Sequence, residues 1–263
     1  MGSKVIQGKL WGQQPKDWAT IQEPTGNAGY TYALNYLQLK PGIKLLDVGC
    51  GTGLFSDLAN KAGADVTGID ASEALIAEAV QRNSSVTFST GEMEELPFAD
   101  NTFDIVCGFN SFQYAASTKN ALTEARRVLK AGGKLAVMIW GNKEDCEAAT
   151  YLKAVGSLLP LPPPRAPGPF ALSENQLLEK VLKETGFKII DNTDIDSIWD
   201  YANTETALRG LMSVGPAAKA IENSGFEKVY DTVLNVIQPY IQSNGHVVYK
   251  NKFRVVIAIT DLR

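Results

Sequence analysis

The sequence predicts an α/β fold in which a mostly parallel sheet carries helices on both faces. In the first 140 residues, short runs rich in β-branched residues alternate with segments of helical period. This alternation is typical of strand-helix-strand units, whose helices cover both faces of a parallel sheet. Two more strand-like runs near the C-terminus enclose a second helical stretch, and we expect them to complete the same sheet.

The expected strands are apolar runs separated by helical or turn-forming segments. The first five are "IKLLDV", "ADVTGID", "SVTFST", "FDIVCGF" and "GKLAVMIW". The last two are "FKIIDNTDIDSIW", which begins at residue 187, and "HVVYKNKFRVVIAIT", which begins at residue 246. Parallel strands buried on both faces have such near-continuous apolar patterns.

Helix signals lie between these runs. Ser72 is expected to cap "SEALIAEAVQRN", and "NALTEARRVLKAGG" is expected to end at Gly132-Gly133. A capping box at 173–176 predicts a helix that runs to Gly186. Residues 203–243 return to a helical pattern with a Gly-Pro break, whereas the proline-rich 158–170 predicts an extended passage.

Composition excludes several classes of protein. The 25 basic and 29 acidic residues give a net charge of −4 without a long run of one sign, so we expect no electrostatic binding of nucleic acid. The three cysteines, Cys50, Cys107 and Cys146, lack the spacing of a zinc site or a disulfide framework, which favours a reducing, cytoplasmic location and no metal. No segment approaches the roughly 18 apolar residues of a membrane span.

The stretch "LLDVGCGTGLF", residues 45–55, places three glycines at alternate positions behind a strand and Asp47. A phosphate-binding P-loop would end in Gly-Lys-Ser/Thr, and no lysine follows here. A dinucleotide-binding loop would have a small residue where Leu54 stands. A plain tight turn explains one or two of the glycines, but not three at this spacing.

The same stretch resembles the first motif of the class I S-adenosylmethionine-dependent methyltransferases. The resemblance covers residues 40–140 closely and implies a Rossmann-like sheet of seven strands with an antiparallel last strand. It also implies that loop amides and the following helix N-terminus face the methionine carboxylate of the cofactor. The cofactor-binding residues it implies in this loop are Asp47, Gly49, Cys50, Gly51 and Gly53.

Further positions support this resemblance in order along the chain. Asp70 ends the second strand and is followed by Ala71 and Ser72. At the position of Asp70, family members have an acidic residue that accepts hydrogen bonds from the ribose hydroxyls of the cofactor. The segment "GEMEELPFADNTFDIV" resembles the adenine-binding part, which assigns Glu92 or its neighbour to the adenine amino group and Met93 to the ring. Asn110 follows the fourth strand, where family members place residues that contact the methionine moiety of the cofactor and the methyl acceptor.

Candidates for the transfer step are fewer, since the sulfonium is already activated and a base is needed only when the acceptor must lose a proton. His246, the only histidine, opens the last strand and is a candidate base, although its place after Asn244-Gly245 favours an exposed turn histidine. Gln113 and Tyr30 are the two further candidates. Family members fold the segment before the glycine loop over the cofactor, which makes aromatic residues there candidates for a lid or a cation-π contact: Trp11, Trp18, Tyr30 and Tyr32.

Three regions follow from these patterns. Residues 1–39 are expected to form lid helices, 40–140 the cofactor-binding core, and 141–263 the rest of the core with a helical cap at about 203–243. The apolar cap favours methyl transfer to a small apolar or aromatic molecule, as in the similar menaquinone and ubiquinone biosynthesis enzymes. A tRNA or protein methyltransferase and a cofactor-binding protein without transfer activity are the alternatives.

Overall fold

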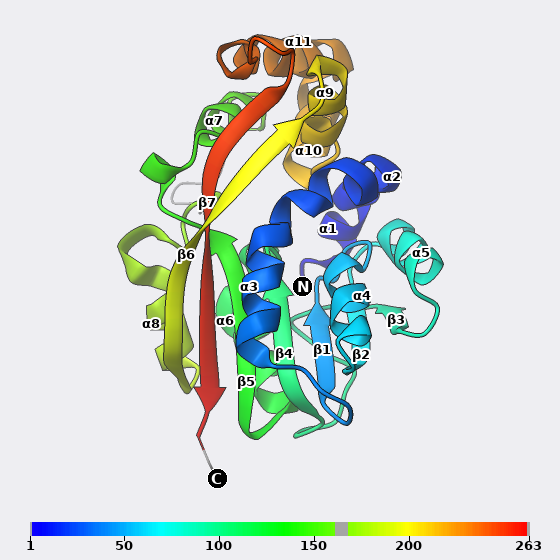
Figure 1. The fold of residues 1–263 in the computed structure, drawn as a ribbon, viewed down its shortest axis with the longest axis vertical. Helices are drawn as coiled ribbons and strands as arrows, with labels where there is room; N and C mark the ends of the chain where they lie inside the picture. The colour runs from blue at the N-terminus through cyan, green and yellow to red at the C-terminus, as the bar shows by residue number, and fades with distance from the viewer. Residues whose placement is uncertain (1, 161–167, 262–263) are drawn as a thin grey trace.

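The computed structural model describes residues 2–160 and 168–261, and the predicted extended passage falls largely outside them, at 161–167. Within the described residues seven strands form one sheet, in the order β3-β2-β1-β4-β5-β7-β6 (Figure 1). The strands are β1 Lys44–Val48, β2 Asp65–Asp70, β3 Thr87–Thr90, β4 Phe103–Phe109, β5 Leu129–Trp140, β6 Phe187–Tyr201 and β7 Val247–Thr260.

Strand directions confirm the predicted fold class. Strands β1 to β5 pair in parallel, and β7 is antiparallel to both β5 and β6. Strands β1 to β3 are added toward one edge of the sheet, and from β4 onward the chain adds strands on the other side of β1. The carboxyl ends of β1 and β4 therefore lie side by side. Open parallel sheets bind ligands at this kind of switch point.

Helices cover both faces of the sheet (Figure 1). The adjacent residues Leu45 and Leu46 of β1 are both fully buried, and they belong to two separate hydrophobic clusters on opposite faces. Helices α3 and α4 pack on the first face, and α6 and α8 on the second. The bounds are α3 Asn27–Leu37, α4 Leu54–Lys61, α5 Glu73–Arg82, α6 Thr118–Val128 and α8 Leu177–Glu184.

Helix ends agree with the sequence in part. Ser72 caps α5 as expected, since its Oγ accepts from the Leu75 amide at 3.3 Å. Helix α6 ends at Val128 rather than at Gly132-Gly133, because the chain pairs with β4 from Leu129 onward. The expected capping box also fails: Ser173 Oγ donates to the Phe170 carbonyl, and α8 begins only after Gln176, which has a left-handed φ of 56°.

The N-terminal segment lies across the carboxyl edge of the sheet. It contains α1 Lys4–Trp11, α2 Pro15–Asp17, a π-helical turn Trp18–Gln22 and a 3₁₀ turn Glu23–Gly26, and it leads into α3. π-helical turns are rare and often occur at functional sites. None of the helices among the described residues is both long and apolar enough to cross a membrane.

The last two strands extend far beyond the sheet edge and carry the remaining helices (Figure 1). Trp140, the last residue of β5, pairs with Phe253, so β6 is the only strand that pairs with residues 247–252 of β7 among the described residues, and Val247 also forms an isolated bridge with Ile241. At about 3.4 Å per residue this two-stranded ribbon projects roughly 20 Å. Helices α7 Ala149–Gly156, α9 Thr204–Met212, α10 Gly215–Ser224 and α11 Phe226–Val236 pack on one another at this end of the molecule, and α9 also contacts β6.

Candidate active site

The glycine loop connects β1 to α4 at the carboxyl edge. Gly49, Gly51 and Gly53 all have positive φ angles, of 72°, 56° and 76°. A Cβ on Gly49 would lie 2.3 Å from Ser111 Cβ, so no side chain fits there. A Cβ on Gly51 would instead enter the space between Glu23 and Trp18, at 3.1 and 3.2 Å from their polar atoms. Glycine therefore allows the positive φ angles of the loop, and at Gly51 it also leaves room for the side chains of the N-terminal segment.

Every amide of this loop already has an acceptor within the protein. The Gly49 and Cys50 amides donate to the Ile69 carbonyl at 2.7 and 3.1 Å, and the Gly53 amide donates to the Cys50 carbonyl at 2.9 Å. The Gly51 amide donates to Asp70 Oδ2 at 2.9 Å. The Thr52 amide donates to Glu23 Oε1 at 3.0 Å. The loop is therefore held from below by β2 and from above by the N-terminal segment.

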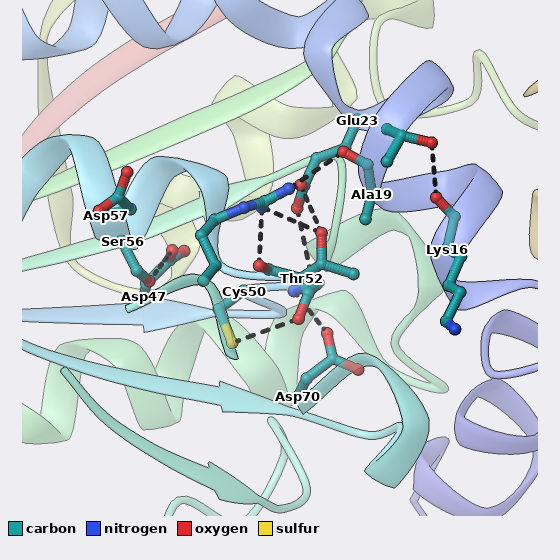
Figure 2. Close-up of polar contacts among 12 residues, drawn as sticks. Lys16, Ala19, Glu23, Asp47, Cys50, Thr52, Ser56, Asp57 and Asp70 are labelled. Carbon is teal, nitrogen blue, oxygen red and sulfur yellow. Dashed lines mark hydrogen bonds and ion pairs between the residues drawn. The ribbon is translucent and has the colours of Figure 1, made fainter. Parts of the chain in front are cut away.

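Glu23 ties the N-terminal segment to the loop. Its carboxylate, only 4% exposed, accepts from the Thr52 amide and hydroxyl and from the Arg82 guanidinium. Arg82 also donates to the Thr52 carbonyl at 2.7 Å and to the Ala19 carbonyl at 3.0 Å. Figure 2 shows Glu23 beside Thr52 of the loop, with Ala19 of the N-terminal segment next to Glu23. Burial raises the pKa of Glu23, which the Arg82 charge opposes.

Asp47 lies beneath the loop rather than in the pocket (Figure 2). It is 2% exposed, and Ser56 Oγ donates to its Oδ2 at 2.6 Å. Burial is the main reason why the pKa of Asp47 is raised to about 7. The hydrogen bond from Ser56 acts in the opposite direction and lowers this pKa. Asp47 thus supports the joint between β1 and α4 and does not line the pocket.

Asp70 ends β2 and lines the pocket as the sequence predicts. Its Oδ1 accepts from the Ser72 amide at 2.8 Å and its Oδ2 from Gly51. A carboxylate has about four lone-pair sites, so each oxygen can accept once more. Burial raises the pKa of Asp70, and the backbone amides oppose that rise. The amides therefore fix this carboxylate while it can still accept from a bound hydroxyl.

Glu92 also lines the pocket, and it holds the start of α1. Its Oε2 accepts from the Lys4 amide at 2.7 Å, and its Oε1 from Ser3 Oγ at 3.3 Å. An acidic side chain is favourable at a helix N-terminus, where backbone amides are free. The predicted adenine contact therefore shares this carboxylate with a helix cap that the sequence did not reveal.

One pocket, with about 810 Å³ of empty space including its open mouth, joins most of the predicted residues. Its lining includes ten of them: Trp11, Trp18, Tyr30, Gly49, Gly51, Asp70, Ala71, Glu92, Met93 and Asn110. Four other residues that the sequence assigns to the cofactor are not among its lining residues: Asp47, Cys50, Gly53 and Ser72.

A second pocket continues from the first toward the β6–β7 ribbon, with about 500 Å³ of empty space. Six residues line both pockets and mark where they meet: Trp11, Trp18, Gln22, Thr25, Asn110 and Tyr114. Asn110 stands at this junction with a left-handed φ of 52°, a strained conformation that asparagine tolerates better than most residues.

The three candidates for the transfer step occupy different places. Tyr30 is buried and lines the first pocket, and burial raises the pKa of its phenol well above the usual value. Gln113 lines neither pocket, and its Nε2 donates to Asn110 Oδ1 at 3.3 Å. His246 lies at the tip of the ribbon, outside both linings, with its Nδ1 2.6 Å from Asp200 Oδ1.

Of the aromatic lid candidates, Tyr32 lies away from the site. Its hydroxyl donates to Asp191 Oδ2 at 2.8 Å and thereby fastens α3 to β6. Trp11 and Trp18 line both pockets, and their rings meet edge to face at 5.0 Å. Sequence reasoning missed Glu23, Arg82 and Gln22, because none stands in a motif and only the folded chain brings them to the loop.

Comparisons with known proteins agree with this geometry. Residues 46–137 match a family model described as a methyltransferase domain. The chain is 32% identical over 166 residues to the O-methyltransferase resE of Aspergillus sclerotiorum, a match that covers 60% of each protein. It is 32% identical over 161 residues to the O-methyltransferase rstn1 of Aspergillus nomiae, which covers 59% of this chain and 68% of that one.

Solved structures share the fold. The cyclase SpnF superposes with a TM-score of 0.59 at 22% identity and covers 89% of this chain and 80% of its own. The chain spans only 60% of the length of resE, so part of that relative has no counterpart in the match. The rstn1 match, the domain model and the seven-stranded sheet together show that the chain belongs to the class I S-adenosylmethionine-dependent methyltransferases, enzymes that transfer methyl groups from that cofactor.

Proposed function

We propose that this chain transfers a methyl group from S-adenosylmethionine to a small molecule with an apolar or aromatic body. The observation that carries the proposal is the junction of two pockets, one at the glycine loop and one lined by aromatic rings. Since both fungal relatives are named O-methyltransferases, oxygen is the first acceptor atom to test.

The first pocket suits S-adenosylmethionine. Asp70 retains free lone pairs for the ribose hydroxyls, and Met93 offers a polarisable side chain to the adenine ring. Gly51 keeps the space above the loop clear of a side chain. S-adenosylmethionine supplies an activated methyl group on a sulfonium, and this chain's residues hold and orient it.

The second pocket suits a flat, uncharged acceptor. Seven aromatic side chains line it: Trp11, Trp18, Tyr114, Trp140, Tyr151, Trp199 and Phe253. The described lining contains no Asp, Glu, Lys, Arg or His. Aromatic rings bind flat apolar molecules by offset or edge-to-face packing. A charged acceptor would lose its hydration here without gaining an ion pair.

The chain's contribution to the reaction is then positioning and the exclusion of water. Because the described lining of the second pocket contains no carboxylate or imidazole, a hydroxyl acceptor would have to lose its proton to solvent as its oxygen takes the methyl group. Alignment of two bound reactants can by itself supply much of a rate enhancement. Asn110, at the junction of the pockets, is well placed to orient the reacting groups.

Calorimetry with S-adenosylhomocysteine tests the cofactor site. We expect binding by the wild-type chain and about 10–100-fold weaker binding by Asp70→Ala, because hydrogen bonds to a carboxylate are lost. The matched control is Asp65→Ala at the exposed start of the same strand, which should bind as the wild type does. Lack of binding by the folded wild-type chain would refute the proposal.

A transfer assay tests the reaction itself. The chain is incubated with methyl-labelled cofactor and a metabolite extract, and labelled products are identified by mass. We expect label in a small, apolar or aromatic product. Cofactor binding without label in any small molecule would show a binding protein or another chemistry, and SpnF, which is named a cyclase, shows that this fold alone does not fix the reaction. Label in RNA or protein would indicate a macromolecular acceptor.

A further inference from the structure

The glycine loop has no free amide for the cofactor's carboxylate. All five amides from Gly49 to Gly53 donate to acceptors within the chain. The helix N-terminus after the loop already faces an anion, because the Glu23 carboxylate lies there and accepts from Thr52. The charge of this carboxylate is offset by the Arg82 guanidinium, which pairs with it. The donor that the motif led us to expect is therefore taken by a side chain of the N-terminal segment.

Trp18 offers the donor that the loop lacks. Its Nε1 is buried and has no hydrogen-bond partner among residues 2–160 and 168–261. This atom lies 3.2 Å from the position that a Cβ would take on Gly51, so it stands directly over the loop. A buried N–H without an acceptor is unfavourable, and most such groups in native proteins have a partner. An acceptor supplied by a ligand would satisfy it.

The chemistry of the indole selects among the cofactor's groups. An indole N–H only donates, so it can pair with a carboxylate and cannot accept from an ammonium group. The ribose and adenine side of the pocket is formed by Asp70, Glu92 and Met93, whereas Trp18 stands over Gly51. We propose that the Trp18 indole N–H binds the carboxylate of S-adenosylmethionine in place of the loop amides. This inference rests on the proposed cofactor.

Trp18→Phe tests this role, because it removes the N–H and keeps an aromatic ring. Calorimetry compares S-adenosylmethionine with its decarboxylated form, S-adenosyl-3-methylthiopropylamine, which lacks only the carboxylate. We expect the wild-type chain to prefer the carboxylated ligand, and Trp18→Phe to reduce that preference about tenfold or more. Its affinity for the decarboxylated ligand should change little.

Trp11→Phe is the matched control, since Trp11 lines the same pocket but its Nε1 already donates to Gln7 Oε1 at 3.2 Å. Its ratio of the two affinities should equal that of the wild type. An unchanged ratio in Trp18→Phe would overturn the inference while leaving cofactor binding intact. Absence of wild-type binding would instead refute the proposed function.

A measurement on the unaltered chain covers the case in which Trp18→Phe does not fold. With ¹⁵N-labelled tryptophan, the Trp18 indole signal should shift downfield on addition of S-adenosylmethionine and remain near its free position with the decarboxylated ligand. Equal shifts with both ligands would show that the carboxylate does not reach this N–H.

Discussion

At the scale of single residues, four carboxylates surround the glycine loop and each has a different task. Asp47 supports the loop from below, Asp70 holds one loop amide and faces the pocket, Glu23 holds the loop from above, and Glu92 caps α1. Asp70 is held by two backbone amides, and each of its oxygens can still accept one more hydrogen bond from a group in the pocket. Burial and hydrogen bonding separate residues that look alike in the sequence.

The raised pKa of Asp47 predicts how stability depends on pH. Its pKa rises from 3.8 to about 7 on folding, so between these values the folded chain holds a proton that the unfolded chain releases. Stability should therefore fall as pH rises from about 4 to about 7, by on the order of 3 kcal/mol, and this contribution should be flat outside that window. Asp47→Asn cannot ionise and should lose this component.

Urea denaturation at several pH values measures the effect as the difference between the wild type and the variant. Asp100→Asn, a change at an exposed carboxylate of the surface, is the control and should leave the pH profile nearly unchanged. A difference between wild type and Asp47→Asn that stays constant from pH 4 to pH 8 would contradict the prediction.

The sequence predicted many of the residues that line the pocket, but not those of the N-terminal segment that hold the glycine loop from above. Gly49, Gly51, Asp70 and Asn110 follow strand ends, where topology gathers them, and motif spacing locates strand ends well. Glu23 follows no strand and stands in a short irregular stretch, so only the packing of the N-terminal segment brings it to Thr52. Contacts between residues distant in sequence leave no periodic signal.

At the scale of elements, the N-terminal segment is fastened to the core by two reciprocal contacts. Glu92 of the core caps the segment's α1, and Glu23 of the segment accepts from the loop that opens α4 in the core. Trp18 and Gln22 therefore lie over the pocket because their own turn is fixed at both sides. This segment is expected to contribute to stability as well as to ligand binding.

The Glu23–Arg82 pair predicts a large stability effect when it is broken. Glu23 is buried, and Arg82→Leu would leave its charge without a partner, which typically costs about 3–5 kcal/mol. Glu23→Gln combined with Arg82→Leu should be less destabilising than the sum of the single changes, because the buried charge is also removed. Chemical denaturation of the four proteins in this cycle measures the coupling. Simple additivity would show that the pair does not act as a unit.

Element directions were easier to predict than element lengths. The sequence placed the start of β7 at the carboxyl edge, since this strand runs antiparallel to its neighbour β5. The β6–β7 ribbon then continues roughly 20 Å past that edge, so His246 lies on its tip beside Asp200. The length of this ribbon depends on the helices packed at its end. The residues of β7 do not show where the neighbouring strand β5 ends.

At the scale of the whole molecule, the cap and the sheet share one hydrophobic core. The same cluster of buried residues includes Leu45 of β1, Tyr151 of α7 and Leu211 of α9. Tyr151 also donates its hydroxyl to the Leu211 carbonyl. The second pocket lies within this joint, since its walls come from the N-terminal segment, the sheet edge, α7 and the start of α10. The regions distinguished in the sequence are therefore expected to unfold together.

Leu211→Ala tests this expectation, since Leu211 is fully buried in the cap. Such changes typically cost about 2–5 kcal/mol through lost burial and the cavity left behind. If cap and sheet form one cooperative unit, far-ultraviolet circular dichroism and tryptophan fluorescence should report the same lowered midpoint, and hydrogen exchange should accelerate in β1 as well as in α9. Leu177→Ala, at a site that is 39% exposed, should change stability by less than about 0.5 kcal/mol. Two separate transitions, with β1 protected after α9 has opened, would instead show that the cap is an independent domain that can move without disturbing the cofactor site.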